Sequence, residues 1–153
     1  MKKWHWAVLI TFLVIGGGGV VYTNTRGLRN KNPGNIRWSL KNNWKGQIGK
    51  DQGDFVIFDS YANGVRAIGK IIDSYKMRGQ LTVEQIITTW APASENNTAA
   101  YVSSVVKQSG LRADTIPWRE EGDYVSIVAA IIKHENGIQP FKRADIATWL
   151  AMP

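Results

Sequence analysis

The sequence predicts one small, mainly helical domain that is preceded by one N-terminal transmembrane helix. Three observations predict this arrangement. The chain has 153 residues, which is the size of a single domain. Residues 4–23 form an almost wholly apolar stretch without a formal charge while His5 is neutral. From Asn63 onward, apolar residues recur at helical spacing. We therefore expect residues 1–25 to be a membrane anchor and residues 26–153 to be the folded domain.

The N-terminal segment 4–23 has about the length that a helix needs to cross ~30 Å of hydrocarbon. Because Lys2 and Lys3 precede it, the positive-inside rule places the N-terminus in the cytoplasm and everything after Thr25 across the membrane. A cleaved signal peptide is the main alternative, although no A-x-A-like cleavage site precedes Asn24. A buried core helix is a further alternative.

The composition excludes several kinds of site and narrows the partners. Without cysteine there is no disulfide framework, no thiolate metal site and no cysteine nucleophile. The net charge is +7, or +5 without the two lysines of the anchor, and it favours a polyanionic partner such as nucleic acid, an anionic lipid surface or an acidic wall polymer. The seven Trp residues suit the stacking of bases or sugars and the anchoring at a membrane interface.

The first part of the domain, residues 26–59, is expected to consist of loops with short extended pieces. Glycine and asparagine are frequent there, and Asn32-Pro33-Gly34 is a turn signal. Residues 55–58 predict one short strand. The apolar spacing that begins at Asn63 predicts a helix that ends near Gly79.

Four more helices are predicted in the rest of the chain. Thr82 and Gln85 form a capping box before a helix that Pro92 ends. Capping residues also precede the next two apolar patterns, so the predicted helices begin at Thr98 and Asp123 and end at Gly110 and Asn136-Gly137. A last helix is expected at about residues 144–152.

The chemistry of the domain is expected to depend on carboxyl groups. His5 belongs to the membrane segment and His134 stands alone in the sequence, so neither a histidine metal cluster nor a Ser-His-Asp triad is credible. No phosphate-binding G-x-x-x-x-G-K-[ST] motif is present. We expect no metal and no cofactor.

Glu135 best fits the general acid of a glycosidase. It ends the most apolar helix, where burial and the negative end of the helix dipole are expected to raise a carboxyl pKa and keep the group protonated. A protonated carboxyl can then donate its proton to the leaving oxygen of a glycosidic bond. The alternative is a solvated glutamate at a helix end beside Lys133.

Glu95 is the second candidate carboxylate. It precedes a helix, where the dipole favours the anion, so it suits a base, a nucleophile or an electrostatic stabiliser. The alternative is a glutamate that only stabilises the start of that helix.

Three segments carry a resemblance to a known family. They are residues 32–37 (NPGNIR), residues 55–60 (FVIFDS) with Gly64 and Arg66, and residues 98–101 (TAAY). Their order resembles that in bacterial cell-wall glucosaminidases and muramidases of the lysozyme-like superfamily. Residues 131–140 look like the end of a transglycosylase catalytic helix, but they come late in the chain. The resemblance therefore implies a mainly α, α+β lysozyme-like fold that is circularly permuted. The block at 26–37 is also similar to the start of small phage or prophage proteins.

The resemblance implies roles for particular residues. Glu135 matches the general acid, and Thr98 with Tyr101 matches a tyrosine loop that faces it across the sugar cleft. Asn32 and Asn35 match polar residues of the cleft floor, or they only shape a turn. Trp90 is expected either to offer a sugar-binding face or to pack in the core, and the same alternatives hold for Trp38, Trp44 and Trp118.

The expected function is a membrane-anchored peptidoglycan hydrolase or lytic transglycosylase of a bacteriophage, which serves genome penetration or host lysis as an endolysin. The expected partners are peptidoglycan, the lipid bilayer through residues 4–23 and other membrane proteins of a virion, with no nucleic acid. The domain is expected outside the cytoplasm or at the internal membrane of a virion. The alternatives are a non-catalytic virion protein with a glycan-binding domain and a nucleic-acid-binding protein held at a membrane.

Overall fold

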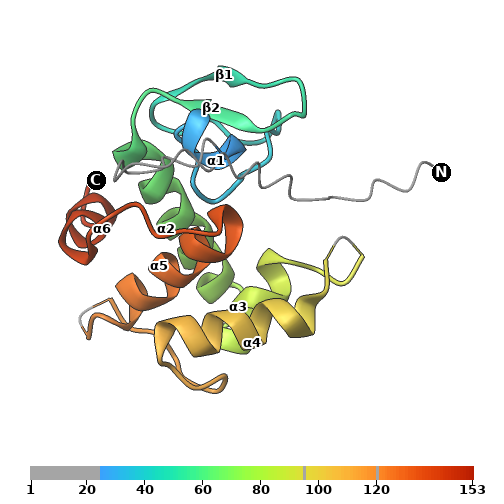
Figure 1. Ribbon diagram of the computed structural model, residues 1–153, viewed down its shortest axis with the longest axis vertical. Coiled ribbons are helices and arrows are strands. Elements are labelled where there is room, and N and C mark those ends of the chain that lie inside the picture. Colours follow the sequence, from blue (N-terminus) through green and yellow to red (C-terminus); the bar gives the residue numbers. More distant parts are fainter. Residues whose placement is uncertain (1–24, 95, 120) are drawn as a thin grey trace, which may run out of the picture.

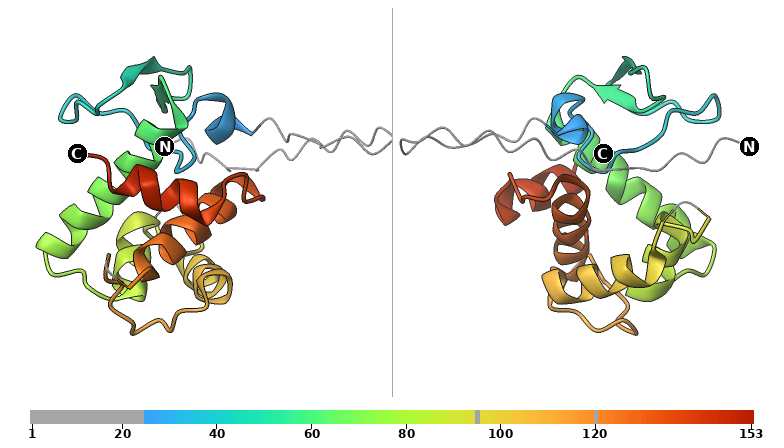
Figure 2. Two further views of the ribbon diagram at one scale, coloured as in Figure 1. Left: turned by 90° about the vertical axis from the view of Figure 1, so that its left-hand side faces the viewer. Right: turned by 45° about the vertical axis from the view of Figure 1, so that its right-hand side comes forward.

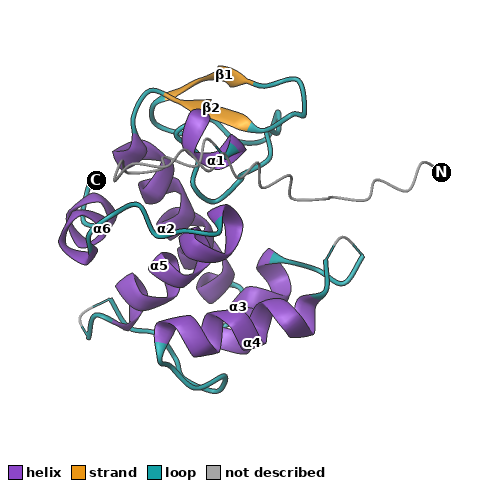
Figure 3. Cartoon of the chain, viewed as in Figure 1, coloured by secondary structure: helices purple, strands orange, loops and turns teal. Residues whose placement is uncertain are grey.

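The computed structural model describes residues 25–94, 96–119 and 121–153. Helices dominate this part of the chain, and the strands form one small sheet (Figure 3). The elements are α1 (Arg26–Arg29), β1 (Gln47–Lys50), β2 (Val56–Phe58), α2 (Tyr61–Met77), α3 (Val83–Trp90), α4 (Thr98–Ser109), α5 (Asp123–Asn136) and α6 (Arg143–Leu150).

The elements are divided between two ends of the molecule. The short helix α1 and the two strands lie together at one end, and we call residues 25–59 the N-terminal lobe (Figure 1). Helices α3 and α4 lie at the opposite end, and α2 and α5 connect the two ends. Helix α6 packs beside α2 and α5, as the rotated views also show (Figure 2). The chain therefore returns to the N-terminal lobe at the end of α5.

The N-terminal lobe depends on one small antiparallel sheet and one buried amide. Strand β1 pairs with β2 in the register Gln47 to Phe58 and Lys50 to Val56. The Asn32 side chain is 1% exposed. Its Nδ2 donates to the carbonyls of Ile36 and Val56, both at 2.9 Å. Its Oδ1 accepts from the Ile36 amide at 2.8 Å. Together with the backbone hydrogen bond from the Val56 amide to the Ile36 carbonyl at 2.9 Å, this amide joins loop 32–36 to β2.

The core lies where α2, α3 and α5 meet. Their apolar stripes supply side chains that are completely removed from water, and burying each one contributes about 1.5–3 kcal/mol. The largest of them are Ile68 and Ile72 of α2, Ile86 and Ile87 of α3, and Ile127, Ile131 and Ile132 of α5. The core thus fixes the direction of α5 independently of the polar residues at its end.

The helix starts agree only in part with the sequence prediction. The capping box of Thr82 and Gln85 is present. The prediction that Thr98 and Asp123 are the N-caps of their helices was wrong. Asn97 caps α4 by accepting from the Ala100 amide, because the Thr98 hydroxyl instead donates to the Ala91 carbonyl at 2.6 Å. Gly122, with a φ of 76°, precedes α5 and offers no side chain for capping.

The fold class expected from the sequence was wrong. A circularly permuted lysozyme-like domain behind a transmembrane helix was expected, whereas the described residues form six helices and a two-stranded sheet. None of the helices in residues 25–153 that the structure describes is long and apolar enough to cross a membrane. The longest, α2, has 17 residues and carries four charged side chains, while α5 has only 14 residues. The predicted anchor segment 4–23 lies outside the described residues.

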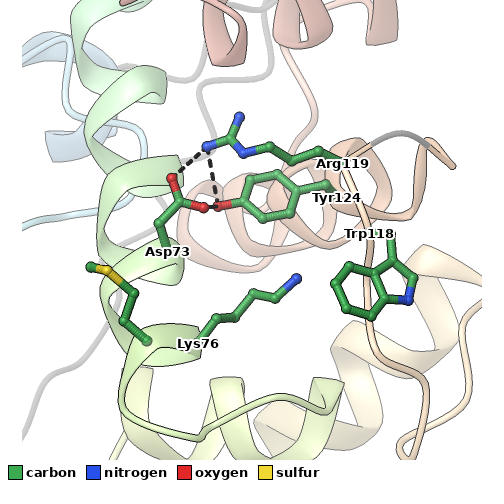
Figure 4. Close-up of a pocket in the computed structure, with 6 residues that line it drawn as sticks. Asp73, Lys76, Trp118, Arg119 and Tyr124 are labelled. Atoms are coloured by element: carbon green, nitrogen blue, oxygen red, sulfur yellow. Dashed lines mark hydrogen bonds and ion pairs between the residues drawn. The ribbon is translucent and has the colours of Figure 1, made fainter.

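A polar cluster fixes the start of α5, far from its carboxyl end. The Tyr124 hydroxyl donates toward the Gly69 carbonyl at 2.6 Å and toward Asp73 at 2.5 Å, and Arg119 pairs with Asp73 at 2.6 Å. Figure 4 shows this cluster beside Lys76 and Trp118, around a pocket of about 290 Å³. Burial and the Asp73 charge raise the pKa of Tyr124. Since Glu135 lies about 16 Å further along the helix, this pocket is separate from it.

Candidate active site

Glu135 lies in the last turn of α5 and accepts hydrogen bonds from three side chains. Tyr101 Oη donates to Oε1 at 2.6 Å, and Trp90 Nε1 donates to the same oxygen at 3.4 Å. Asn35 Nδ2 donates to Oε2 at 2.9 Å. These donors come from α4, from the end of α3 and from the N-terminal lobe. Folding therefore brings together four residues that are up to 100 positions apart in the sequence.

Tyr101 is the closest and most buried of these partners. It is 3% exposed, on the face of α4 that packs against α5. Burial and the adjacent Glu135 charge raise the pKa of Tyr101 well above its usual value. The phenol therefore keeps its proton at any physiological pH and remains a hydrogen-bond donor to the carboxylate.

His134 covers the outer face of the tyrosine ring. The two ring centroids are 3.7 Å apart and the planes are inclined by 20°. The imidazole Nδ1 lies 2.9 Å from the Ser104 hydroxyl of α4. Burial lowers the pKa of His134, although the Glu135 charge opposes this effect. The neutral ring thus holds Tyr101 from the side opposite to the core.

Asn35 reaches Glu135 from a strained turn. Its φ is 47°, a left-handed conformation that asparagine tolerates better than most residues. The buried Asn32 amide fixes the same loop. The Asn35 Oδ1 atom is buried without a hydrogen-bond partner in the described part of the chain. The Asn35 side chain thus donates to Glu135 through Nδ2, while its Oδ1 can still accept a hydrogen bond from another group.

Trp90 approaches Glu135 with the edge of its indole. Its ring packs against Gly34, where an added Cβ would lie 3.2 Å from the indole Cη2 and 2.8 Å from Ile68. A glycine is therefore needed next to Asn35 so that the tryptophan can come close to the loop.

The two oxygens of Glu135 differ in what they can still accept. A carboxylate has about four lone pairs, two on each oxygen. Tyr101 and Trp90 both use Oε1, whereas the described residues donate only one hydrogen bond to Oε2. The carboxyl is half-buried. Oε2 is therefore the oxygen with capacity for a proton or for a hydroxyl group of a ligand.

Asn136 is a structural residue of this site that the sequence analysis treated only as a helix stop. It is 3% exposed. Its Nδ2 donates to the carbonyls of Pro33 and Ile132, both at 2.8 Å, and its Oδ1 accepts from the Thr25 hydroxyl at 2.7 Å. These bonds join the end of α5 to the turn before Asn35 and to the start of α1. The only sequence signal was an asparagine directly after Glu135.

Among the other predicted site residues that the structure describes, Asn32 and Thr98 form no hydrogen bond with Glu135. Asn32 is buried and its amide bonds within the loop, as the alternative of a turn-shaping residue expects. Thr98 bonds the Ala91 carbonyl. Glu95 lies outside the described residues. Trp38 contacts Lys50, Trp44 packs against the core, and Trp118 is 49% exposed beside Lys76.

A metal centre is not indicated in this part of the molecule. Among residues 25–153 that the structure describes, no group of three or more His, Asp or Glu residues is arranged to hold a metal ion. At Glu135 the surrounding groups are donors and aromatic rings, which suit a carboxylate and a polar ligand rather than a cation.

Comparison with known proteins shows similarity to a bacteriophage protein. No protein family model matches the chain, so the likeness to lysozyme-like enzymes depends on short motifs alone. Protein P5 of Pseudoalteromonas phage PM2 is 32% identical to the chain over 125 residues, which cover 79% of this chain and 77% of the relative. This agrees with the expected phage origin. The chain belongs to the family of protein P5 of Pseudoalteromonas phage PM2.

Proposed function

We propose that the chain is a phage enzyme that cleaves β-1,4 glycosidic bonds of peptidoglycan, with Glu135 as the general acid and then the base. The observation that supports this most is the convergence of Tyr101, Trp90 and Asn35 on one half-buried carboxyl group. Cleavage of a glycosidic bond needs a carboxyl in a fixed orientation next to the leaving oxygen. Three donors from three separate elements supply that orientation.

In the proposed reaction, Glu135 donates a proton from Oε2 to the glycosidic oxygen as the bond to the anomeric carbon breaks. Tyr101 and Trp90 stay on Oε1 and hold the carboxylate that results. Glu135 then accepts a proton from the attacking group. Water as that group gives hydrolysis, and the 6-hydroxyl of the muramic acid gives a 1,6-anhydro sugar. Asn35 has to shift or share Oε2 when the sugar enters.

Glu95 is proposed as an auxiliary carboxylate. A second carboxylate near the anomeric carbon can serve as nucleophile, base or electrostatic stabiliser. Because enzymes that use the substrate's own groups need no such residue, Glu135 is the required group and Glu95 the dispensable one.

The test is zymography of the full-length protein on purified peptidoglycan. Glu135→Gln keeps the size of the side chain and removes the acid, so clearing should be lost. Glu84→Gln, at an exposed position of α3, is the matched control and should clear normally. Clearing that persists in Glu135→Gln would remove it as the acid. Mass spectrometry of the released muropeptides separates reducing from 1,6-anhydro products.

A glycan-binding protein without activity is the second candidate function. The observation that favours it is the satisfied state of Oε1, since such bonding also suits a purely structural carboxylate. Sedimentation with peptidoglycan distinguishes the two. Equal binding by the wild type and Glu135→Gln, with no clearing by either, would support this second candidate.

The proposed location is a membrane, with residues 4–23 as the anchor and the domain 26–153 outside the cytoplasm or at the internal membrane of a virion. Protease protection of membranes from infected cells tests the orientation. Detection of the protein in purified virions would favour a role in genome penetration, and detection only in infected cells would favour host lysis.

A further inference from the structure

We propose that an open pocket of the N-terminal lobe binds the phosphate group of an anionic phospholipid. The pocket has a volume of about 440 Å³ and is lined by Arg26 and Arg29 of α1, by Lys50 at the end of β1 and by the turn 51–53. None of these residues bonds to Glu135. The inference rests on the membrane location proposed above and is independent of glycan cleavage.

Aromatic rings hold two of the cations around this pocket. Arg26 and Arg29 are three residues apart on α1, so their side chains leave the helix on the same side. The Arg26 guanidinium lies 4.4 Å from the centre of the Phe55 ring, and Lys50 Nζ lies 4.4 Å from the centre of the Trp38 ring. The rings support the cations without neutralising their charge.

Asp51 lines the pocket and Asp54 follows closely in the chain, and each pairs with one of the pocket's cations, Arg26 and Lys50 respectively. Asp51 Oδ1 accepts from the Gly53 and Phe55 amides at 2.9 and 3.0 Å. Its Oδ2 accepts from Asn30 at 2.7 Å and lies 3.7 Å from Arg26 Nε. Asp54 pairs with Lys50 at 2.5 Å. Within the described part of the chain, no hydrogen bond or ion pair engages the exposed Arg29 side chain. Cations therefore exceed carboxylates at this pocket.

The lobe as a whole, residues 25–59, carries a net charge of +4, with seven Lys or Arg residues against three Asp residues. Residues 26–50 contain seven Lys or Arg residues and no Asp or Glu. Two apolar side chains of the same lobe are exposed to solvent, Leu40 at 89% and Ile48 at 67%. Cations and exposed apolar side chains in one lobe suit a bilayer interface, where headgroups meet acyl chains, better than they suit a nucleic acid.

The position of the pocket in the chain also indicates a bilayer. Arg26 follows the apolar segment 4–23 by three residues, which span at most about 11 Å when extended. A basic cluster directly beside a membrane segment gains affinity from each lysine or arginine near anionic headgroups. The same three cations would then hold the domain against the surface to which its anchor attaches it.

Vesicle flotation of the full-length protein tests this inference. The measured quantity is the ratio of partition coefficients between vesicles with about one third phosphatidylglycerol and vesicles of phosphatidylcholine alone. Binding through the apolar segment contributes equally to both partition coefficients, so it cancels in their ratio. The variant with Arg26→Gln, Arg29→Gln and Lys50→Gln should lower the ratio at least about tenfold. The matched control, Lys70→Gln with Lys107→Gln and Lys142→Gln, removes the same charge from exposed positions in α2, in α4 and directly before α6, and should change the ratio less than about twofold.

If the triple variant does not fold, the single variant Arg29→Gln replaces it in the flotation test. It should lower the ratio of partition coefficients several-fold. An unchanged ratio, or an equal decrease in the control, would overturn the inference. Binding of inorganic phosphate to the wild type without any preference for anionic vesicles would overturn the lipid as the source of the phosphate. Salt-sensitive retention of duplex DNA that the pocket variant loses, at an unchanged vesicle ratio, would assign the pocket to nucleic acid instead. Peptidoglycan clearing is not part of the readout, so these outcomes are distinct from a failure of Glu135→Gln.

Discussion

The Tyr101 hydroxyl donates a hydrogen bond of 2.6 Å to Glu135 across the contact between α4 and α5. The tyrosine is buried and its pKa is raised, so its hydroxyl keeps its proton and remains a hydrogen-bond donor to Glu135. The stacked imidazole of His134 fixes the ring from outside. The orientation of the proposed catalytic carboxyl thus depends on a packed pair of helices and not on a mobile loop.

Tyr101→Phe should lower peptidoglycan clearing by roughly tenfold to hundredfold, because a hydrogen bond to a charged group contributes about 1.5–3 kcal/mol. The ring and its stacking with His134 remain. Initial rates on labelled peptidoglycan measure the effect. Tyr75→Phe, at a half-buried tyrosine of α2, is the control and should keep the full rate. A fully active Tyr101→Phe beside an inactive Glu135→Gln would show that the phenol does not position the carboxyl.

Asn136→Ala should destabilise the fold by about 2–4 kcal/mol, because it leaves the Pro33 carbonyl and the Thr25 hydroxyl without their partner inside the protein. Urea denaturation measures the free energy of unfolding. Glu135→Gln, one residue earlier, should shift it by less than about 1 kcal/mol. Equal destabilisation by both substitutions would contradict the distinction between a structural residue and a site residue.

Gly27→Ala should destabilise the protein by about 1–3 kcal/mol through overpacking. An added Cβ would lie 2.5 Å from Asn136 Oδ1 and 3.0 Å from the Asn32 carbonyl oxygen, at the junction of α1, α5 and the loop of Asn35. Gly49→Ala is the matched control, since nothing lies within 4 Å of its added Cβ. Thermal denaturation compares the two. The prediction fails if both alanines lower the melting temperature by the same amount.

His134 should make the fold less stable in mild acid. Its pKa is lowered by burial, so below the ordinary value of 6.5 the unfolded chain binds a proton that the folded chain resists. Stability from this group is therefore present above pH 6.5 and is lost as the pH falls through the lowered pKa. Urea denaturation at several pH values between about 7 and 5 should show a shallower decrease for His134→Gln than for the wild type. Parallel curves would show that another group causes the acid dependence.

The candidate site could be predicted from the sequence where the signal was local. Glu135 lies at the end of an apolar helical pattern, and Tyr101 is the tyrosine of a T-x-x-Y motif, so both are visible in short windows of residues. His134 and Asn136 were missed for the opposite reason. Their partners Ser104 and Pro33 are 30 and 103 positions away, and no spacing rule connects residues at such separations.

The fold was predicted only at the level of its elements. Helical periodicity located the helices, because a stripe of apolar residues is a property of one segment. The predicted fold class was wrong because it depended on short motifs such as Asn32 to Arg37 and Asp59-Ser60. In the structure, these motifs form turns and a helix cap. Asn32 joins loop 32–36 to β2, and Ser60 caps α2 by accepting from the Asn63 amide. Such turn chemistry recurs in unrelated folds.

By itself, the sequence determined the apolar N-terminal segment, the positive charge, the positions of the helices and the choice of Glu135. Each of these is a property of one stretch of chain. Only the tertiary structure decided that Asn35, Trp90 and Tyr101 meet at that carboxyl and that Arg26, Arg29 and Lys50 share one pocket. The reason is that burial of the core side chains sets how the helices pack, and this packing brings residues from separate elements within hydrogen-bond distance.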